Sequence, residues 1–222
     1  MIFRDRAQAG RALAQRLMHL RSARPVVLAL PRGGVPVAAE IAEALAAPLD
    51  LLLVRKIGAP GMPEFALGAV VEGTTPEMVL NEEAVRRLGV PREYLEGEAA
   101  RQYAEIGRQR ELYLRGRPFP GLQGHTAIVV DDGIATGATM RAALRGLAQA
   151  GAARSIVLAA PVAPPETAAA LRDACDEAVF LEAPENFAAV GAFYADFKQV
   201  EDNTVMALLE RAASRGMPWP GE

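Results

Sequence analysis

The amino-acid sequence predicts an α/β fold in which helices flank a mainly parallel, twisted sheet. Short, apolar, β-branched runs such as Ala127–Val130 are typical of strands covered on both faces. These runs alternate with helical patterns, which favours parallel strands joined by right-handed crossovers. The hydrophobic content of 51% and the charged content of 23% are those of a globular protein rather than a disordered chain. We expect one domain over residues 1–222, with an appended subdomain.

The first part of the chain has the pattern of a helix, a strand, a loop and a second helix. Residues 5–20 carry apolar side chains at spacings of four, as an amphipathic helix does. The apolar run 25–30 leads into Pro31-Arg32-Gly33-Gly34 and then into a helical pattern over 37–45. Two glycines allow the chain to approach a ligand closely, and an arginine beside them supplies donors for an anion. A tight turn without a ligand is the alternative for this loop.

A third apolar run, 49–54, is followed directly by Arg55 and Lys56. We predict that these two cations lie at a strand end beside the ligand loops, and a solvated surface pair is the alternative. Residues 58–64 are dense in turn residues and could form a mobile lid, and 65–71 is another predicted strand.

Residues 81–117 differ from their surroundings and are predicted to be a helical insertion. Two helical patterns, Glu82–Leu88 and Arg92–Leu114, are separated by a glycine and a proline. The second is rich in charges, which predicts a solvated helix with pairs four residues apart, such as Arg101 with Glu105.

The last third of the chain continues the alternation. Strands are predicted over 154–161 and 178–181, with a helix over 166–175 between them. The single cysteine, Cys175, is expected to pack inside that helix rather than to react. A terminal helix is predicted over 200–215, and Trp219 in the frayed end that follows could dock or join an interface.

The most informative stretch is Thr126–Gly137, in which a predicted buried strand runs into Asp131 and Asp132 and then into a loop of small residues. The carboxyl ends of parallel strands are where ligands bind in such sheets. A small-residue loop before a helix directs backbone N–H groups and the positive end of the helix dipole at one spot, which suits a phosphate. Adjacent carboxylates accept hydrogen bonds from two neighbouring hydroxyls. Together these features predict a site for a ribose 5-phosphate.

The segment VVDDGIATGAT closely resembles the signature of the type I phosphoribosyltransferases, which bind phosphoribosyl pyrophosphate (PRPP). The resemblance implies that Asp131 and Asp132 hold the ribose hydroxyls. It also implies that the loop holds the 5′-phosphate, through Gly133, Ile134, Ala135, Thr136, Gly137, Ala138 and Thr139. Gly133 departs from the family, which more often has an aliphatic residue or serine, and we expect it to change the stiffness of the loop. The alternative is a plain strand end with solvated aspartates.

Other segments take on roles through the same resemblance. Arg32, Gly33 and Gly34 resemble the family's pyrophosphate loop, which often contains an unusual peptide conformation, and Arg55 and Lys56 would assist them. The aromatic tail 182–200 would be the family's hood, a small subdomain that selects the acceptor, with simple packing as the alternative. Within the predicted helical insertion, an arginine could swing over the pyrophosphate, the candidates being Arg108, Arg110 and Arg115.

The predicted function is transfer of a 5-phosphoribosyl group from PRPP to a nitrogenous base, with release of pyrophosphate. Mg²⁺ would bind mainly through substrate and water, so no protein metal cage is expected, and no general base can be assigned. Two alternatives are a PRPP- or nucleotide-sensing regulatory protein without turnover and a phosphatase. The phosphatase is disfavoured because its nucleophile motif places aspartates two residues apart near the chain start.

Charge and hydropathy limit the partners. The net charge of −3 and the pI near 5.6 argue against a protein that binds nucleic acid by broad phosphate neutralisation. No apolar run approaches the ~20 residues that span a bilayer, and the start lacks a secretory signal, so a cytoplasmic protein without membrane contact is expected. The resembling family is commonly homodimeric, and we expect a homodimer here.

Overall fold

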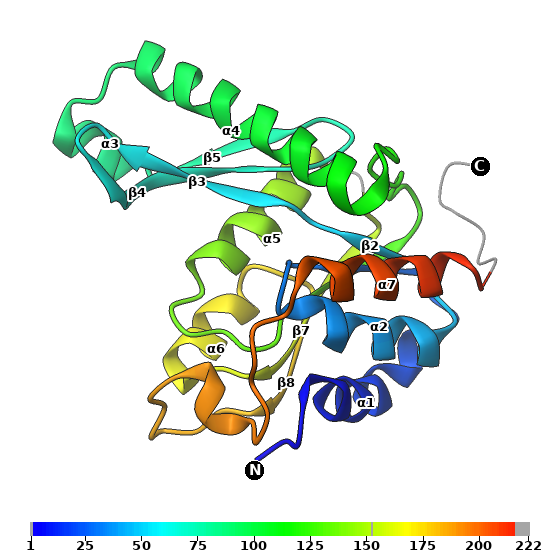
Figure 1. The fold of residues 1–222 in the computed structure, drawn as a ribbon. Coiled ribbons are helices and arrows are strands. Elements are labelled where there is room, and N and C mark those ends of the chain that lie inside the picture. Colours follow the sequence, from blue (N-terminus) through cyan, green and yellow to red (C-terminus); the bar gives the residue numbers. More distant parts are fainter. Residues whose placement is uncertain (1, 152, 216–222) are drawn as a thin grey trace.

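The computed structural model of the protein describes residues 2–151 and 153–215. Its centre is a five-stranded sheet in the order β2-β1-β6-β7-β8, with every neighbouring pair parallel (Figure 1). The predicted fold class is therefore confirmed. The strands are β1 (Pro25–Ala29), β2 (Leu49–Leu51), β6 (Thr126–Val130), β7 (Ser155–Val162) and β8 (Glu177–Glu182).

Helices cover both faces of this sheet, because successive side chains of a strand point to opposite faces. Val27 and Ile128 pack into one apolar cluster, whereas Val26 and Ala127 pack into the other. The first cluster lies under α1 (Arg6–Leu17), α2 (Gly34–Leu45) and α7 (Asp202–Ala213). The second lies under α5 (Ala138–Ala150) and α6 (Pro165–Arg172). Burial on both faces explains why β1 and β6 are apolar along almost their whole length.

A second, antiparallel sheet, in the order β3-β4-β5, stands beside the first (Figure 1). Its strands are β3 (Val54–Ala59), β4 (Met62–Val71) and β5 (Glu77–Leu80), and they lie between α5 on one side and α4 (Arg92–Leu114) on the other. The short helix α3 (Glu82–Leu88) follows β5. Both helices of the predicted insertion thus have the predicted bounds.

This second sheet corrects two predictions. Arg55 and Lys56 do not follow a strand end: β2 ends at Leu51, and both cations lie within β3. The apolar run looked continuous because Leu52 and Leu53, which join the two strands, are also buried. The turn-rich residues 58–64 contain the tip of the β3–β4 hairpin, where Gly61 has a φ of +70°. Whether this tip acts as a lid stays a prediction.

The charged helix α4 packs on the core through four buried apolar residues and one buried arginine. Arg110 donates hydrogen bonds to a carboxylate oxygen of Asp50 and to one of Glu72, both at 2.9 Å, and the arginine is only 7% exposed. The idea that Arg110 swings over pyrophosphate is therefore wrong, since its guanidinium is committed to these two acids.

Other charges of α4 lie at the surface, as predicted, but their pairing differs. Arg101 pairs with Glu98 rather than with Glu105, which pairs with Arg108 instead. Arg115 pairs with Glu210 of α7. Spacings of three and four both bring side chains together on a helix, so a pattern of charges does not decide between them. A role of Arg108 or Arg115 in binding stays a prediction.

Glu72 makes the stability of the fold depend on pH. Burial raises the pKa of its carboxyl from 4.5 to about 7, although Arg110 opposes this shift. The folded state therefore holds the proton more tightly than the unfolded chain does, and the stability that this proton contributes is present below pH 4.5 and is lost as the pH rises through about 7. We expect Glu72→Gln to gain stability relative to the wild type by about 1 kcal/mol per pH unit across this window. Urea unfolding of both proteins at a series of pH values checks this, and a constant difference would contradict it.

Three further predictions concern Cys175, membrane-spanning helices and Trp219. The predicted helix over 166–175 is α6, which ends at Arg172, so Cys175 lies beyond it, and its thiol donates to the carbonyl oxygens of Leu171 and Glu177. The described segments contain no helix that is long and apolar enough to cross a membrane. The prediction for Trp219 falls outside the described residues.

Candidate active site

The glycine loop and the aspartate pair, about a hundred residues apart in sequence, meet at the carboxyl edge of the parallel sheet. They follow β1 and β6, which are neighbours in register, with Ala29 opposite Val130. A Cβ atom on Gly33 would lie 2.2 Å from Oδ2 of Asp132, and one on Gly34 would lie 2.6 Å from the carbonyl oxygen of Val130. Both positions therefore require glycine. The peptide bond between Pro31 and Arg32 is cis.

This close approach makes Gly33 a sensitive position. We expect Gly33→Ala to push the Asp132 carboxylate out of place, since the added methyl group would overlap an oxygen atom at 2.2 Å. PRPP binding should weaken about tenfold or more, or about 1.4 kcal/mol. Isothermal titration calorimetry measures the loss. The matched control is Gly97→Ala, because a Cβ at Gly97 meets nothing within 4 Å. Equal affinities for the two variants would contradict the prediction.

The two carboxylates share one electrostatic environment. The backbone N–H of Asp132 donates to Oδ1 of Asp131 at 2.8 Å, and Oδ2 of Asp132 accepts from Nε of Arg6 at 2.7 Å. Burial raises the pKa of both carboxyl groups, and the charge of Asp132 raises that of Asp131 further. Arg6 acts in the opposite direction on the pKa of Asp132. A ligand that brings hydroxyl donors or positive charge would stabilise the ionised form of these two carboxyl groups.

Arg6 and Tyr194 complete this environment. Arg6 was absent from the sequence prediction, and Tyr194 was predicted only as part of the aromatic tail 182–200. The guanidinium of Arg6 lies 3.9 Å from the ring centroid of Phe197 and donates to the carbonyl oxygen of Lys198 at 2.8 Å. The Tyr194 hydroxyl donates to the carbonyl oxygen of Asp132 at 2.5 Å. These partners lie 126 and 62 residues from Asp132 in sequence, so no local pattern indicates them. The aromatic tail therefore contacts the site, while its predicted role as a hood stays a prediction.

The predicted phosphate loop runs from the end of β6 to the start of α5. The N–H of Ile134 donates to the carbonyl oxygen of Val162, and the hydroxyl of Thr167 donates to that of Ala135, each at 2.9 Å. Gly137 has a φ of +72°, a conformation that favours glycine, and α5 begins at the next residue. Within residues 2–151 and 153–215, the backbone N–H groups of residues 135–139 donate to no protein acceptor. They are therefore available to an anion.

The structure supplies a reason for the unusual glycine at position 133. A Cβ atom there would lie 2.4 Å from Cγ1 of Val190, in the 3₁₀ helix η2 (Val190–Phe193). The tail therefore occupies the space that a side chain at position 133 would need. The expected change in loop stiffness is not tested by this contact.

A cavity of about 450 Å³ adjoins the glycine loop and brings Arg32, Arg55 and Thr139 together. Asp202 of α7 also lines this cavity, and its carboxylate lies 3.4 Å from the guanidinium of Arg32 and accepts a hydrogen bond from the Tyr113 hydroxyl at 2.6 Å. Burial, together with this hydrogen bond, raises the pKa of Tyr113 to about 12. Arg32 and Arg55 supply donors for an anion beside the glycine loop, although the cavity is also lined by the acidic residues Asp202 and Glu105.

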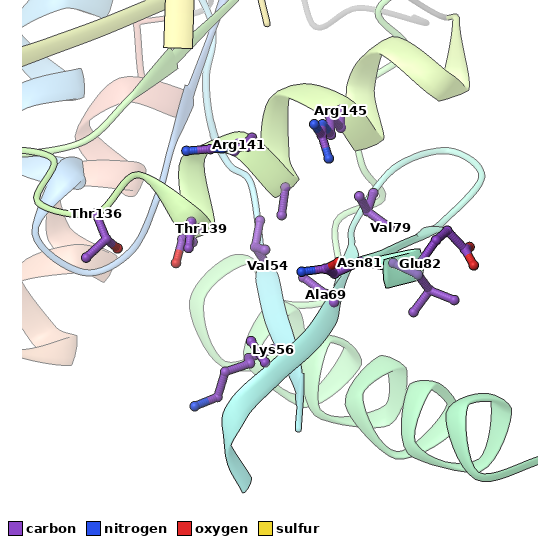
Figure 2. A pocket seen from close by; sticks show the side chains of 15 residues that line it. Val54, Lys56, Ala69, Val79, Asn81, Glu82, Thr136, Thr139, Arg141 and Arg145 are labelled. Atoms are coloured by element: carbon purple, nitrogen blue, oxygen red, sulfur yellow. The ribbon is translucent and has the colours of Figure 1, made fainter. Parts of the chain in front are cut away.

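Lys56 does not join this group. It lines a neighbouring cavity of about 680 Å³ between β3–β5 and α5, together with Thr136 and Thr139 of the phosphate loop (Figure 2). Successive residues of a strand point to opposite sides, which explains why Arg55 and Lys56 face different cavities. No group of three or more metal-binding side chains occurs among the described residues.

The fold and the site together define an α/β protein in which a small-residue loop and a carboxylate pair follow one strand at the carboxyl edge of a parallel sheet. The family model of the phosphoribosyl transferase domain matches residues 3–198, and the chain belongs to this family. The resemblance seen in the sequence is thus confirmed.

Two comparisons extend this assignment. The chain is 48% identical to a Thermus thermophilus protein, TT1426, and matches its crystal structure with a TM-score of 0.82 over 100% of both chains. It is 46% identical over 211 residues to a protein of Mycobacterium tuberculosis that is provisionally named a phosphoribosyl transferase. That match covers 95% of this chain and 47% of the relative, so the chain spans about half the length of the curated relative.

Proposed function

We propose that the protein transfers a 5-phosphoribosyl group from PRPP to a nitrogenous base and releases pyrophosphate. The observation that carries this proposal is the meeting of three features at one sheet edge. They are the Asp131–Asp132 pair, the glycine loop against it and the phosphate loop after it. A ribose with phosphates at its two ends matches this arrangement. Its hydroxyls can donate to the carboxylates, and its phosphates can accept from the backbone N–H groups and the arginines.

Each group has a role in this proposal. Asp131 and Asp132 accept hydrogen bonds from the ribose hydroxyls and orient the ring. The N–H groups of residues 135–139 bind the 5′-phosphate. Arg32 and Arg55 bind the pyrophosphate in the smaller cavity and neutralise charge as it departs. Positive charge that develops on the sugar ring is stabilised by the nearby carboxylates.

Mg²⁺ fits this site as an ion held mainly by substrate and water. The donor set is a single carboxylate pair with raised pKa values rather than a cage of acids. The ion would neutralise phosphate charge beside Asp131 and Asp132. A homodimer and a cytoplasmic location are also proposed, on the family resemblance and the sequence.

The decisive experiment is a turnover assay with PRPP, Mg²⁺ and a panel of purine and pyrimidine bases, in which pyrophosphate release is measured. Release that depends on one base would support the transferase and identify the acceptor. The control omits the base, so that simple hydrolysis of PRPP is subtracted. Binding of PRPP without base-dependent release from any of the panel would instead favour a PRPP- or nucleotide-sensing protein, the alternative function of this fold.

A further inference from the structure

The larger cavity is lined mostly by side chains that have no role in the proposed reaction. One wall is the face of α5 that carries Arg141 and Arg145, and the other is formed by the antiparallel sheet (Figure 2). The cavity measures about 680 Å³. That volume lies within the range of small-molecule sites, roughly 300–1,000 Å³.

The α5 wall carries positive charge that the protein itself does not neutralise. Arg141 and Arg145 are four residues apart, so they lie on the same face of the helix. Within the described chain, neither side chain forms a hydrogen bond or an ion pair, and Nε of Arg141 is buried without an acceptor. A buried donor without a partner is costly and indicates a missing acceptor.

The opposite wall does not supply that acceptor. Lys56 adds a third cation, and its own partner, Glu64, has a side chain that is 96% exposed. Glu82 is the single acidic residue among those that line the cavity, and in Figure 2 its carboxylate points away from Arg145. The cavity is therefore suited to a ligand with several negative charges.

The position of the cavity relates it to the phosphate loop. Thr136 and Thr139 line the cavity at its loop end, and Arg145 lies one turn of α5 beyond Arg141, about 6 Å along the helix axis. A chain of phosphates that starts at the loop would meet the two arginines in succession. The cavity is thus at the 5′-phosphate end of the proposed site, whereas the reacting carbon of the sugar lies at the other end, toward Asp131 and Asp132. It is not the place for the acceptor base.

Apart from Lys56, the strands of the sheet wall contribute apolar and mostly small side chains. Ala66, Ala69 and Val79 lie opposite Ala142 of α5. Such a surface stabilises a flat ring by burying it, and it offers few hydrogen bonds to a chain of phosphates.

The geometry points to a nucleoside di- or triphosphate as the ligand of this cavity. Its terminal phosphate lies on the phosphate loop, the phosphates behind it bind Arg141 and Arg145, and its base lies on the apolar sheet wall. This inference rests on the proposed function, because the same loop binds the 5′-phosphate of PRPP. The nucleotide therefore competes with PRPP and acts as an inhibitor. No bond is formed or broken.

The test compares Arg145→Gln with the wild type by calorimetric titration of ATP, GTP, CTP and UTP. Arg145 is exposed, so the change to Gln removes a charge without opening the core. We expect at least one nucleotide to bind the wild type, to bind the variant tenfold or more weakly, and to raise the apparent Kd for PRPP. Arg16→Gln, an exposed change on α1 that lines neither cavity, is the matched control. Equal nucleotide affinities in the wild type and in Arg145→Gln would overturn the inference.

Two further arms separate this inference from the proposed function. Tripolyphosphate lacks a base, so binding as tight as that of ATP would overturn the assignment to a nucleotide. PRPP binding and base-dependent pyrophosphate release by Arg145→Gln without nucleotide are expected to equal those of the wild type. If the wild type shows no transfer, the proposed function fails, while the nucleotide affinities of the two proteins still decide the inference.

Discussion

Replacement of Arg110 by alanine is expected to destabilise the protein by about 3–5 kcal/mol. The change leaves Asp50, which is fully buried, and Glu72, which is 6% exposed, without the guanidinium that bridges them. Arg110 lowers the pKa of both carboxyl groups against the effect of burial, so both pKa values should rise further in the variant. Urea-induced unfolding at neutral pH, followed by circular dichroism, measures the loss.

Two variants define the cause of that loss. Arg108→Ala removes an exposed arginine two residues away on the same helix, and it should cost no more than about 0.5 kcal/mol. The triple variant Asp50→Asn, Glu72→Gln, Arg110→Met removes the three bridging charges together and should recover part of the stability. The recovery is limited by Arg117, which lies 3.8 Å from Asp50 and keeps its charge. Equal losses for Arg110→Ala and Arg108→Ala would mean that the buried pairs do not anchor α4.

Replacement of Asp131 and Asp132 together by asparagine should weaken PRPP binding about a hundredfold or more, or about 2.7 kcal/mol. Asparagine keeps the size of each side chain but accepts weaker hydrogen bonds than a carboxylate does. The substitution removes two like charges that burial disfavours, but it also leaves the guanidinium of Arg6 without the carboxylate of Asp132, so a moderate loss of stability is expected beside the loss of binding. Calorimetry with PRPP and Mg²⁺ measures the affinity.

The control for this variant is Asp173→Asn, which changes an exposed aspartate at the end of α6. It should bind PRPP as the wild type does. A melting temperature for the double variant well above the temperature of the titration would show that lost binding is not lost folding. An unchanged affinity in the double variant would remove the carboxylate pair from the proposed site.

Much of the parallel sheet could be predicted from the sequence, because buried strands are apolar throughout. The site motifs were also predictable, since each follows such a strand directly: Arg32 after β1, and Asp131 and Asp132 after β6. Parallel neighbours place their carboxyl ends together, so the meeting of the two motifs follows from topology.

Other features could not be predicted because they depend on distant partners. The second sheet was hidden in the run 49–54, where Leu52 and Leu53 are buried without belonging to a strand. Arg110 resembled its exposed neighbours on α4, and only the folded chain places Asp50 and Glu72 beside it. Arg6 and Tyr194 carry no local signal of their contact with Asp132.

The contacts of Arg6 also determine when the site can form during synthesis of the chain. Arg6 is synthesised before Phe197 and Lys198, which hold its guanidinium and lie almost 200 residues further along the chain. The sheet around Asp132 is complete once β8 has been made. The hydrogen bond from Tyr194 to Asp132 and the contacts that hold Arg6 form only after the tail has been synthesised. A nascent chain that stops before the tail can therefore contain all five strands of the parallel sheet and still lack a finished site.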